Sequence, residues 1–228
     1  MLNYDIDPSV LAPFVPGGTE LDTFGGRTIV SIVGFLFLDT RVFGFPIPFH
    51  RNFEEVNLRF YVRRRTGDGW RRAVVFIKEI VPRFAIAATA RAVYGEKYVA
   101  VPMGHHLQLR TDSGEPLRDV AYTWRIAGRG CSIRMSVRGE PREIEAGSEA
   151  EFITEHYWGY SRRRDGRTLE YQVAHARWRA WFPSDASFDG EVAETYGREF
   201  VAPLGGAPVS AFLADGSAVT VYRGRLLA

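Results

Sequence analysis

The two lysines of this chain, Lys78 and Lys97, are its only side-chain primary amines among 29 lysine and arginine residues. Lys97 ends the run Tyr94-Gly95-Glu96-Lys97, where a turn could aim its amine at a carbonyl compound. A lysine that forms a Schiff base in this way needs a lowered pKa. The adjacent Glu96 works against this, because a neighbouring carboxylate favours the charged amine and raises its pKa. The run therefore marks a candidate site without supporting an activated lysine.

A second group of chemistry-bearing residues lies on a strand that we predict over residues 55–62. Its residues alternate between apolar and polar, as in a strand with two different faces. The apolar face carries Val56, Leu58, Phe60 and Val62. The polar face carries Glu55, Asn57, Arg59 and Tyr61. Two interpretations follow for the polar face: it lines a pocket, or it meets solvent, because antiparallel sheets commonly expose one face.

The other motifs indicate neither a metal nor a cofactor. None of the five histidines shows the helical pairing around a glutamate that marks a zinc site. His105 and His106 could ligate a metal, but adjacent loop histidines are more typical of a solvated pair. No glycine-rich phosphate loop and no nucleophile elbow is present. We therefore expect no metal and no cofactor.

Composition limits the class of protein. The 228 residues are 46% hydrophobic, which suits one domain over residues 1–228, and the net charge of +2 predicts no nucleic-acid or membrane partner. The arginine clusters at residues 63–72 and 162–167 bracket Asp-Gly turns, so we interpret them as solvated hairpin ends. A single cysteine, Cys131, and the absence of an apolar leader at the N-terminus favour a cytoplasmic protein.

The elements that must position these residues are mainly short strands. A capped helical turn is expected at Asp7-Pro8, a buried strand over residues 28–38, and a loop at residues 45–48. The predicted strand over residues 55–62 pairs through a turn with one over residues 72–80. An alanine-rich helix is predicted from Pro82 to Tyr94, ended by Gly95.

Beyond residue 103 we expect strands over residues 107–110, 120–127, 132–137, 152–160, 168–176 and 218–222, with a short helix near residues 190–196. The predicted fold class is α+β and mainly antiparallel β, with a curved, barrel-like sheet around a cavity and one central helix.

Three stretches together resemble a known family. They are DPSVLAPFVPGGTELD at residues 7–22, FEEVNLRFYV at residues 53–62 and PRFAIAATARAVYGEKYVAVPM at residues 82–103. In this order and spacing they are similar to the YqjF-like family of uncharacterised bacterial proteins (domain of unknown function 2071). That family is a branch of the acetoacetate decarboxylase-like superfamily. The resemblance implies a curved antiparallel sheet closing around a largely apolar cavity.

The resemblance also assigns positions in the site. The decarboxylases carry Tyr-Pro-Lys-Lys after the helix, with the first lysine as nucleophile and the second as its activator. Here Glu96 stands in the nucleophile's place and Lys97 in the activator's place, so decarboxylation by that mechanism is disfavoured. The family's pocket glutamate matches Glu55. Family members also carry a strand before the Asp-Pro turn, of which this chain would hold at most the end.

Three functions compete at this point. The first is a small-molecule pocket protein that binds a carboxylated or carbonyl-bearing ligand, with Arg59 as anion partner and with Tyr61, Tyr94 and Met103 as walls. The second is a lyase-type enzyme acting on keto acids through a lysine Schiff base, at Lys97 or Lys78, or through a Glu55–Glu96 acid/base pair. The third is a non-catalytic oligomeric scaffold, and homo-oligomers fit any of the three.

Overall fold

The computed structural model describes residues 1–42, 45–46, 51–84, 97–110, 116–183 and 185–227. The predicted helix from Pro82 to Tyr94 lies largely outside the described residues, as do the candidate site residues Tyr94 and Glu96.

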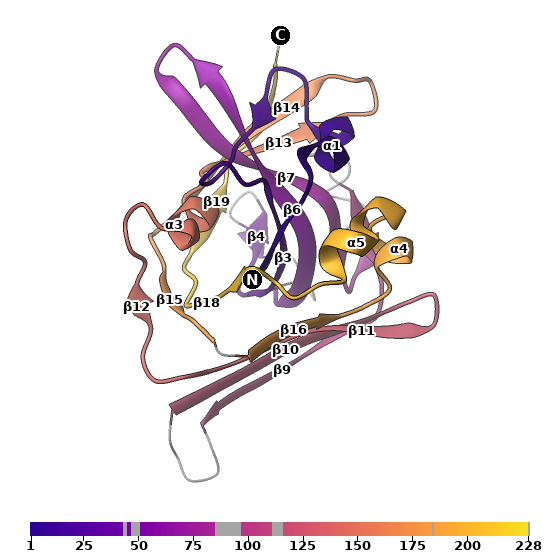
Figure 1. Ribbon diagram of the computed structural model, residues 1–228, viewed down its shortest axis with the longest axis vertical. Helices are drawn as coiled ribbons and strands as arrows, with labels where there is room; N and C mark the ends of the chain where they lie inside the picture. The colour runs from indigo at the N-terminus through magenta and orange to yellow at the C-terminus, as the bar shows by residue number, and fades with distance from the viewer. Residues whose placement is uncertain (43–44, 47–50, 85–96, 111–115, 184, 228) are drawn as a thin grey trace.

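A large, strongly curved sheet forms the centre of the molecule (Figure 1). Its strands follow the order β17 (Ser210–Ala211), β1 (Leu2–Asp5), β3 (Ile29–Phe37), β6 (Phe53–Thr66), β7 (Gly69–Val81), β13 (Trp158–Arg162), β14 (Thr168–His175) and β19 (Val219–Val221). Three short strands join it: β2 (Glu20–Leu21) on β6, β8 (Tyr98–Ala100) on β7 and β20 (Arg225–Leu226) on β14. Among the described residues β17 and β19 do not pair with each other, so the sheet is curved but not a closed barrel.

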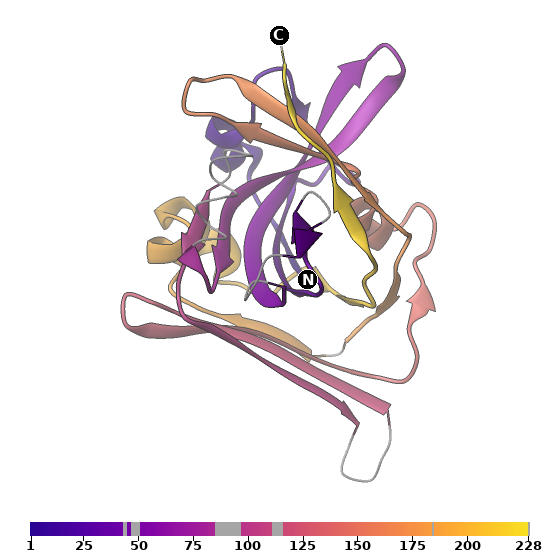
Figure 2. The same cartoon turned by 180° about the vertical axis from the view of Figure 1, so that it is seen from behind.

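The predicted hairpin is confirmed and is longer than expected. β6 and β7 pair antiparallel from Val56↔Ile80 to Thr66↔Gly69, with one irregularity after Leu58. β13 pairs with β7 in parallel and leads into β14, and the C-terminal strand β19 lies along β14, as Figure 2 shows from behind. The predicted buried strand over residues 28–38 is β3, whose first five residues are buried.

A second sheet of four strands lies across the first and is seen below it in Figure 1. Its order is β16 (Asp185–Asp189), β11 (Arg129–Arg138), β10 (Pro116–Ile126) and β9 (Met103–Arg110). The two sheets approach closely at Gly34, where an added Cβ would lie 2.6 Å from Cδ2 of Tyr122. Only glycine fits at this contact, so Gly34 sets how near the sheets can pack.

The remaining elements are short. They are the strands β12 (Arg142–Glu143), β15 (Arg179–Trp181) and β18 (Leu213–Ala214), the pair β4 (Arg41–Val42) and β5 (Phe45–Pro46), the helices α1 (Pro8–Leu11), α3 (Glu149–Thr154), α4 (Val192–Thr195) and α5 (Val201–Leu204), and the 3-10 turns η1 (Ala12–Phe14) and η2 (Arg198–Phe200). No helix within the described ranges is long and apolar enough to cross a membrane.

Two local predictions are wrong. The strand expected over residues 152–160 begins only at Trp158, because α3 extends to Thr154 and occupies the first three of those residues. The Ser148 side chain caps this helix by accepting from the Glu151 amide at 3.2 Å, while the Glu151 carboxylate accepts from Gly147 N at 2.7 Å. The loop expected at residues 45–48 also begins with a short antiparallel pairing between β4 and β5.

The predicted turn at Asp7-Pro8 is confirmed as α1, capped by Asp7 accepting from Ser9 N at 2.8 Å.

The arginine cluster at residues 63–72 does more than form a solvated hairpin end. Glu170 on β14 is fully buried, and its carboxylate accepts from Arg71 at 2.9 Å and from Arg225 at 2.7 Å. The Tyr160 hydroxyl donates to the same carboxylate at 2.7 Å, and Arg64 lies 3.5 Å away. This cluster ties the β6–β7 hairpin to β14 and β20, so part of the arginine excess is structural.

Candidate functional site

The polar face of β6 is buried. Glu55 is 2% exposed, and Asn57 and Tyr61 are each 1% exposed, while Arg59 is half-buried. Phe152 and Ile153 of α3, Ala180 of β15 and Phe212 pack with Tyr61 in a cluster of buried apolar residues. Of the two interpretations of this face, exposure to solvent is therefore excluded. The opposite face of β6, with Val56, Leu58, Phe60 and Val62, lies in the main core.

Glu55 is held by two donors. The Asn57 amide Nδ2 donates to one carboxylate oxygen at 3.0 Å, and the Tyr98 hydroxyl donates to the other at 3.2 Å. Burial raises the pKa of Glu55 to about 7, although these hydrogen bonds and the charge of Arg59 act in the opposite direction. Glu55 is therefore a carboxyl group that can exchange a proton near neutral pH.

Arg59 lies between Glu55 and Tyr61 along the same face. Its Nη2 donates to the backbone carbonyl of Ile153 at 3.3 Å, and its guanidinium lies 5.8 Å from the centre of the Tyr61 ring. Its Nε is buried, with no hydrogen-bond partner among the described residues. Within the same residues no carboxylate forms a salt bridge with this guanidinium, and the buried donor therefore has capacity for an acceptor.

A chain of hydrogen bonds fixes Tyr61. Ser31 Oγ donates to Asn3 Oδ1 at 2.7 Å, so the Tyr61 hydroxyl, also 2.7 Å away, donates to Ser31. Asn3 Nδ2 in turn donates to Ser210 Oγ at 2.9 Å. Asn3, Ser31 and Arg59 are paired in register on three neighbouring strands. They form one row across the sheet, so Asn3 and Ser31 share the face of Arg59.

His156 is a further buried polar group beside Tyr61. The two ring centres are 4.7 Å apart. Neither ring nitrogen has a hydrogen-bond partner among the described residues, and Nε2 lies 3.7 Å from Oδ2 of Asp22, beyond hydrogen-bond distance. Burial lowers the pKa of His156 to about 4, aided by the charges of Arg72 and Arg59 against the opposing effect of Asp22. The imidazole is therefore neutral at pH 7.

We expect His156→Phe to stabilise the protein by about 1 kcal/mol at pH 7, because it removes buried polar atoms that lack partners. The gain should grow by about 2 kcal/mol, to about 3 kcal/mol in all, near pH 5. The unfolded wild-type chain takes up a proton below pH 6.5, whereas folded His156 resists protonation down to about pH 4. Urea unfolding at both pH values measures this, with exposed His106→Phe as baseline. A loss of more than about 2 kcal/mol at pH 7 would mean that the imidazole has a partner.

The structure separates Lys97 and Lys78 from this face. Lys97 is exposed, and its Nζ lies 4.8 Å from the centre of the Phe14 ring. The next residue, Tyr98, reaches Glu55, because adjacent side chains of an extended segment point to opposite sides. Lys78 pairs with Leu58 and therefore lies on the apolar face of the hairpin, where burial lowers its pKa.

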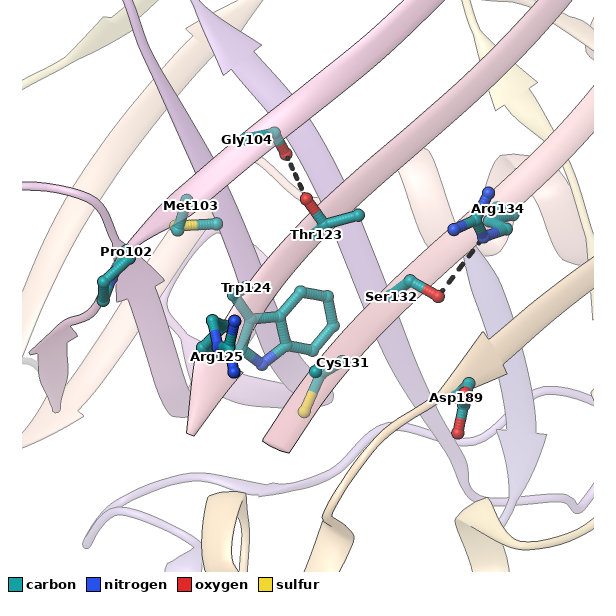
Figure 3. Close-up of a pocket in the computed structure, with 11 residues that line it drawn as sticks. Pro102, Met103, Gly104, Thr123, Trp124, Arg125, Cys131, Ser132, Arg134 and Asp189 are labelled. Atoms are coloured by element: carbon teal, nitrogen blue, oxygen red, sulfur yellow. Dashed lines mark hydrogen bonds between the residues drawn. The ribbon is translucent and has the colours of Figure 1, made fainter. Parts of the chain in front are cut away.

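Met103, predicted as a pocket wall, instead lines an open depression on the four-stranded sheet (Figure 3). This depression has a volume of about 500 Å³. It is lined by Pro102, Met103, Gly104, Thr123, Trp124, Arg125, Gly130, Cys131, Ser132, Arg134 and Asp189. None of these residues belongs to the polar face of β6, so the structure brings together Glu55, Arg59 and Tyr61 but places Met103 elsewhere.

Several residues of the buried polar face escaped the sequence analysis. Glu79 pairs in register with both Asn57 and Tyr98 and is 2% exposed. Glu79 follows Lys78 in the second hairpin strand, so strand alternation predicts that the two side chains lie on opposite faces. Asn3, Ser31 and His156 carried no comparable signal, because strand pairing and the turn after α3 place them. No group of three or more His, Cys, Asp or Glu side chains suited to a metal lies within the described ranges.

The chain is similar to known proteins in sequence and in fold. The chain is 39% identical over 68 residues to the uncharacterized protein YqjF of Bacillus subtilis (strain 168), an alignment that spans 29% of this chain and 28% of that relative. Its fold is similar to that of acetoacetate decarboxylase from Legionella pneumophila, with a TM-score of 0.66 and 15% identity over 100% of this chain and 83% of the other. It is also similar to the enduracididine biosynthesis enzyme MppR complexed with pyruvate, with a TM-score of 0.65 and 15% identity over 100% and 86% of the two chains.

The fold is therefore acetoacetate decarboxylase-like, as the sequence resemblance implied. The profile of one family, DUF2071, described as an uncharacterized conserved protein, matches residues 1–218. The chain belongs to the DUF2071 family.

Proposed function

We propose that this protein binds a small carboxylate-bearing molecule against the buried polar face of β6, with Arg59 as its anion partner. The observation that carries the proposal is the half-buried Arg59 guanidinium, whose Nε has no acceptor and which has no carboxylate in salt-bridge contact among the described residues. A guanidinium removed from water without a counter-ion is costly, and a carboxylate suits its planar donor geometry. A bound anion would supply both the missing charge and the missing acceptor.

Glu55 and Tyr61 complete the proposed site. Glu55 lies on the same face as Arg59, with Asn57 between them. It is protonated on a fraction of molecules at neutral pH and could then donate to a ligand oxygen. Tyr61, fixed by Ser31, is the proposed wall on the other side of Arg59. The MppR structure bound to pyruvate has the same fold, and we take pyruvate from it as a first probe.

Calorimetric titration with pyruvate tests the proposal. We expect saturable binding to the wild-type protein and at least a tenfold loss of affinity in Arg59→Gln, since one charged hydrogen-bonded contact contributes about 1.5–3 kcal/mol. Arg63→Gln is the matched control, because Arg63 lies on the same strand, its side chain is 40% exposed, and it already pairs with Glu20 at 2.7 Å. Equal affinity in wild type and a folded Arg59→Gln variant would reject Arg59 as the anion partner.

A lyase-type enzyme acting on keto acids is the second candidate function, and the near-neutral pKa of Glu55 favours it as an acid or base. A covalent lysine mechanism has a separate test. Borohydride reduction with pyruvate or acetoacetate, followed by intact-mass measurement, should leave no adduct if the protein only binds its ligand. An adduct lost in Lys97→Ala or Lys78→Ala would instead identify a Schiff-base lysine. We further propose that the protein is cytoplasmic and can form homo-oligomers. If no probe binds, the function that remains is a non-catalytic scaffold without a ligand.

A further inference from the structure

A second buried atom beside Arg59 lacks a partner. Asn57 is 1% exposed, and its Oδ1 has no hydrogen-bond donor among the described residues. The Asn57 Nδ2 donates to the Glu55 carboxyl group at 3.0 Å, which leaves Oδ1 as the unused end of the amide. The face therefore presents an unused acceptor, Asn57 Oδ1, and an unused donor, Arg59 Nε, on residues two positions apart.

The unused acceptor on Asn57 and the unused donor on Arg59 restrict which molecules could bind. Buried polar groups are almost always satisfied by protein, water or ligand, so two such atoms on one face point to a molecule with complementary groups. Same-face residues of a strand are separated by about 6.6 Å along it. A molecule a few bonds across, with one hydrogen bond at each end, fits this spacing.

We propose that the ligand is a carboxylate with a hydrogen-bond donor on the adjacent carbon, such as a 2-hydroxy or 2-amino acid. This inference rests on the proposed function and adds its substrate class. The carboxylate accepts from Arg59 Nε, and the neighbouring hydroxyl or amine donates to Asn57 Oδ1. A 2-keto acid is a poorer fit, because its keto oxygen would face the Asn57 carbonyl oxygen, acceptor against acceptor.

Four three-carbon carboxylates separate the possibilities by calorimetry. L-lactate and L-alanine carry a donor at the second carbon, pyruvate carries an acceptor there, and propionate carries neither. We expect lactate or alanine to bind at least tenfold more tightly than pyruvate and propionate, since a site built to hydrogen-bond a hydroxyl rejects analogues that lack it. Preference for lactate over alanine, or the reverse, decides which donor the site takes.

Asn57→Ala locates the effect. In this variant lactate and alanine should lose their advantage over propionate, and cooperative urea unfolding should report that the variant is folded. Asn52→Ala, an exposed asparagine before β6, is the matched control. Equal wild-type affinity for all four acids overturns the inference and leaves the proposed function standing. Binding of none of them rejects both.

Discussion

Replacing Glu170 by alanine is expected to lower the free energy of unfolding by about 3 kcal/mol at pH 7, the lower end of what removing one partner of a buried ion pair costs. The Glu170 side chain is fully buried, whereas Arg64 and Arg71 are 27% and 23% exposed and Arg225 is 64% exposed. The arginines can regain water, which is why we take the lower end. The loss comes from three guanidiniums left facing one another and from the buried Tyr160 hydroxyl left without its acceptor.

The Glu170 effect should depend on pH. Burial raises the pKa of Glu170, but the hydrogen bonds from Tyr160 and Arg225 and the charges of Arg71 and Arg225 outweigh it, and the net pKa lies below the ordinary value of 4.5. A lowered carboxyl pKa stabilises the fold above pH 4.5, and this stabilisation is lost as the pH falls through the folded-state pKa. Urea unfolding should therefore show a smaller difference in the free energy of unfolding between wild type and Glu170→Ala near pH 3 than at pH 7.

Asp165→Ala is the control for Glu170, because Asp165 is an exposed carboxylate of the β13–β14 hairpin that pairs with Arg167 at 2.7 Å. Exposed pairs contribute about 0.2–1 kcal/mol. A loss in Glu170→Ala no larger than in Asp165→Ala would show that the arginines do not depend on the buried carboxylate.

Glu55→Gln is expected to stabilise the protein by about 3 kcal/mol at pH 8 and to have little effect at pH 4, because 1.36 kcal/mol accompanies each unit of pKa shift. The folded-state pKa of Glu55 is raised from 4.5 to about 7. As the pH rises through this window the unfolded chain loses its proton first, so the wild-type protein loses stability that the glutamine variant keeps. The difference between the two proteins isolates Glu55, since His156 titrates in both.

The same variant has a consequence for binding. With an anionic ligand at Arg59, wild-type affinity should fall as the pH rises above about 7, because Glu55 then places a second negative charge on the face. Glu55→Gln should bind with an affinity that is flat across this range. Exposed Glu20→Gln is the control for both measurements. A wild-type unfolding profile that parallels Glu55→Gln from pH 4 to pH 8 would show that Glu55 has no raised pKa.

Local patterns predicted the hairpin that carries the site. The alternation over residues 55–62 and the glycines at residues 67 and 69 determine β6, β7 and their turn through contacts close in sequence. The same holds for α1, where Asp7 and Pro8 act within one helical turn. The strand expected over residues 152–160 failed for an equally local reason, since Ser148 and Glu151 have the spacing of a capping box and were overlooked.

The environment of the polar face could not be predicted in the same way. Whether Glu55 and Arg59 meet water depends on α3, which lies about ninety residues further along the chain, as the Arg59–Ile153 contact shows. The hydrogen bond from Asn3 to Ser210 joins still more distant segments. Such contacts follow from strand order and sheet curvature, and a single sequence carries little information about either.

Lys97 directly precedes β8 and Tyr98 opens it, and their side chains reach different partners, the Phe14 ring and the Glu55 carboxyl group. β8 is three residues long and runs parallel to β7. A slip of one residue in a strand exchanges the side chains on its two faces. Moved by one position, β8 would turn the Lys97 amine toward Glu55 and carry Tyr98 outward. A single deletion or insertion next to this strand would therefore exchange the hydroxyl group at Glu55 for a lysine amine.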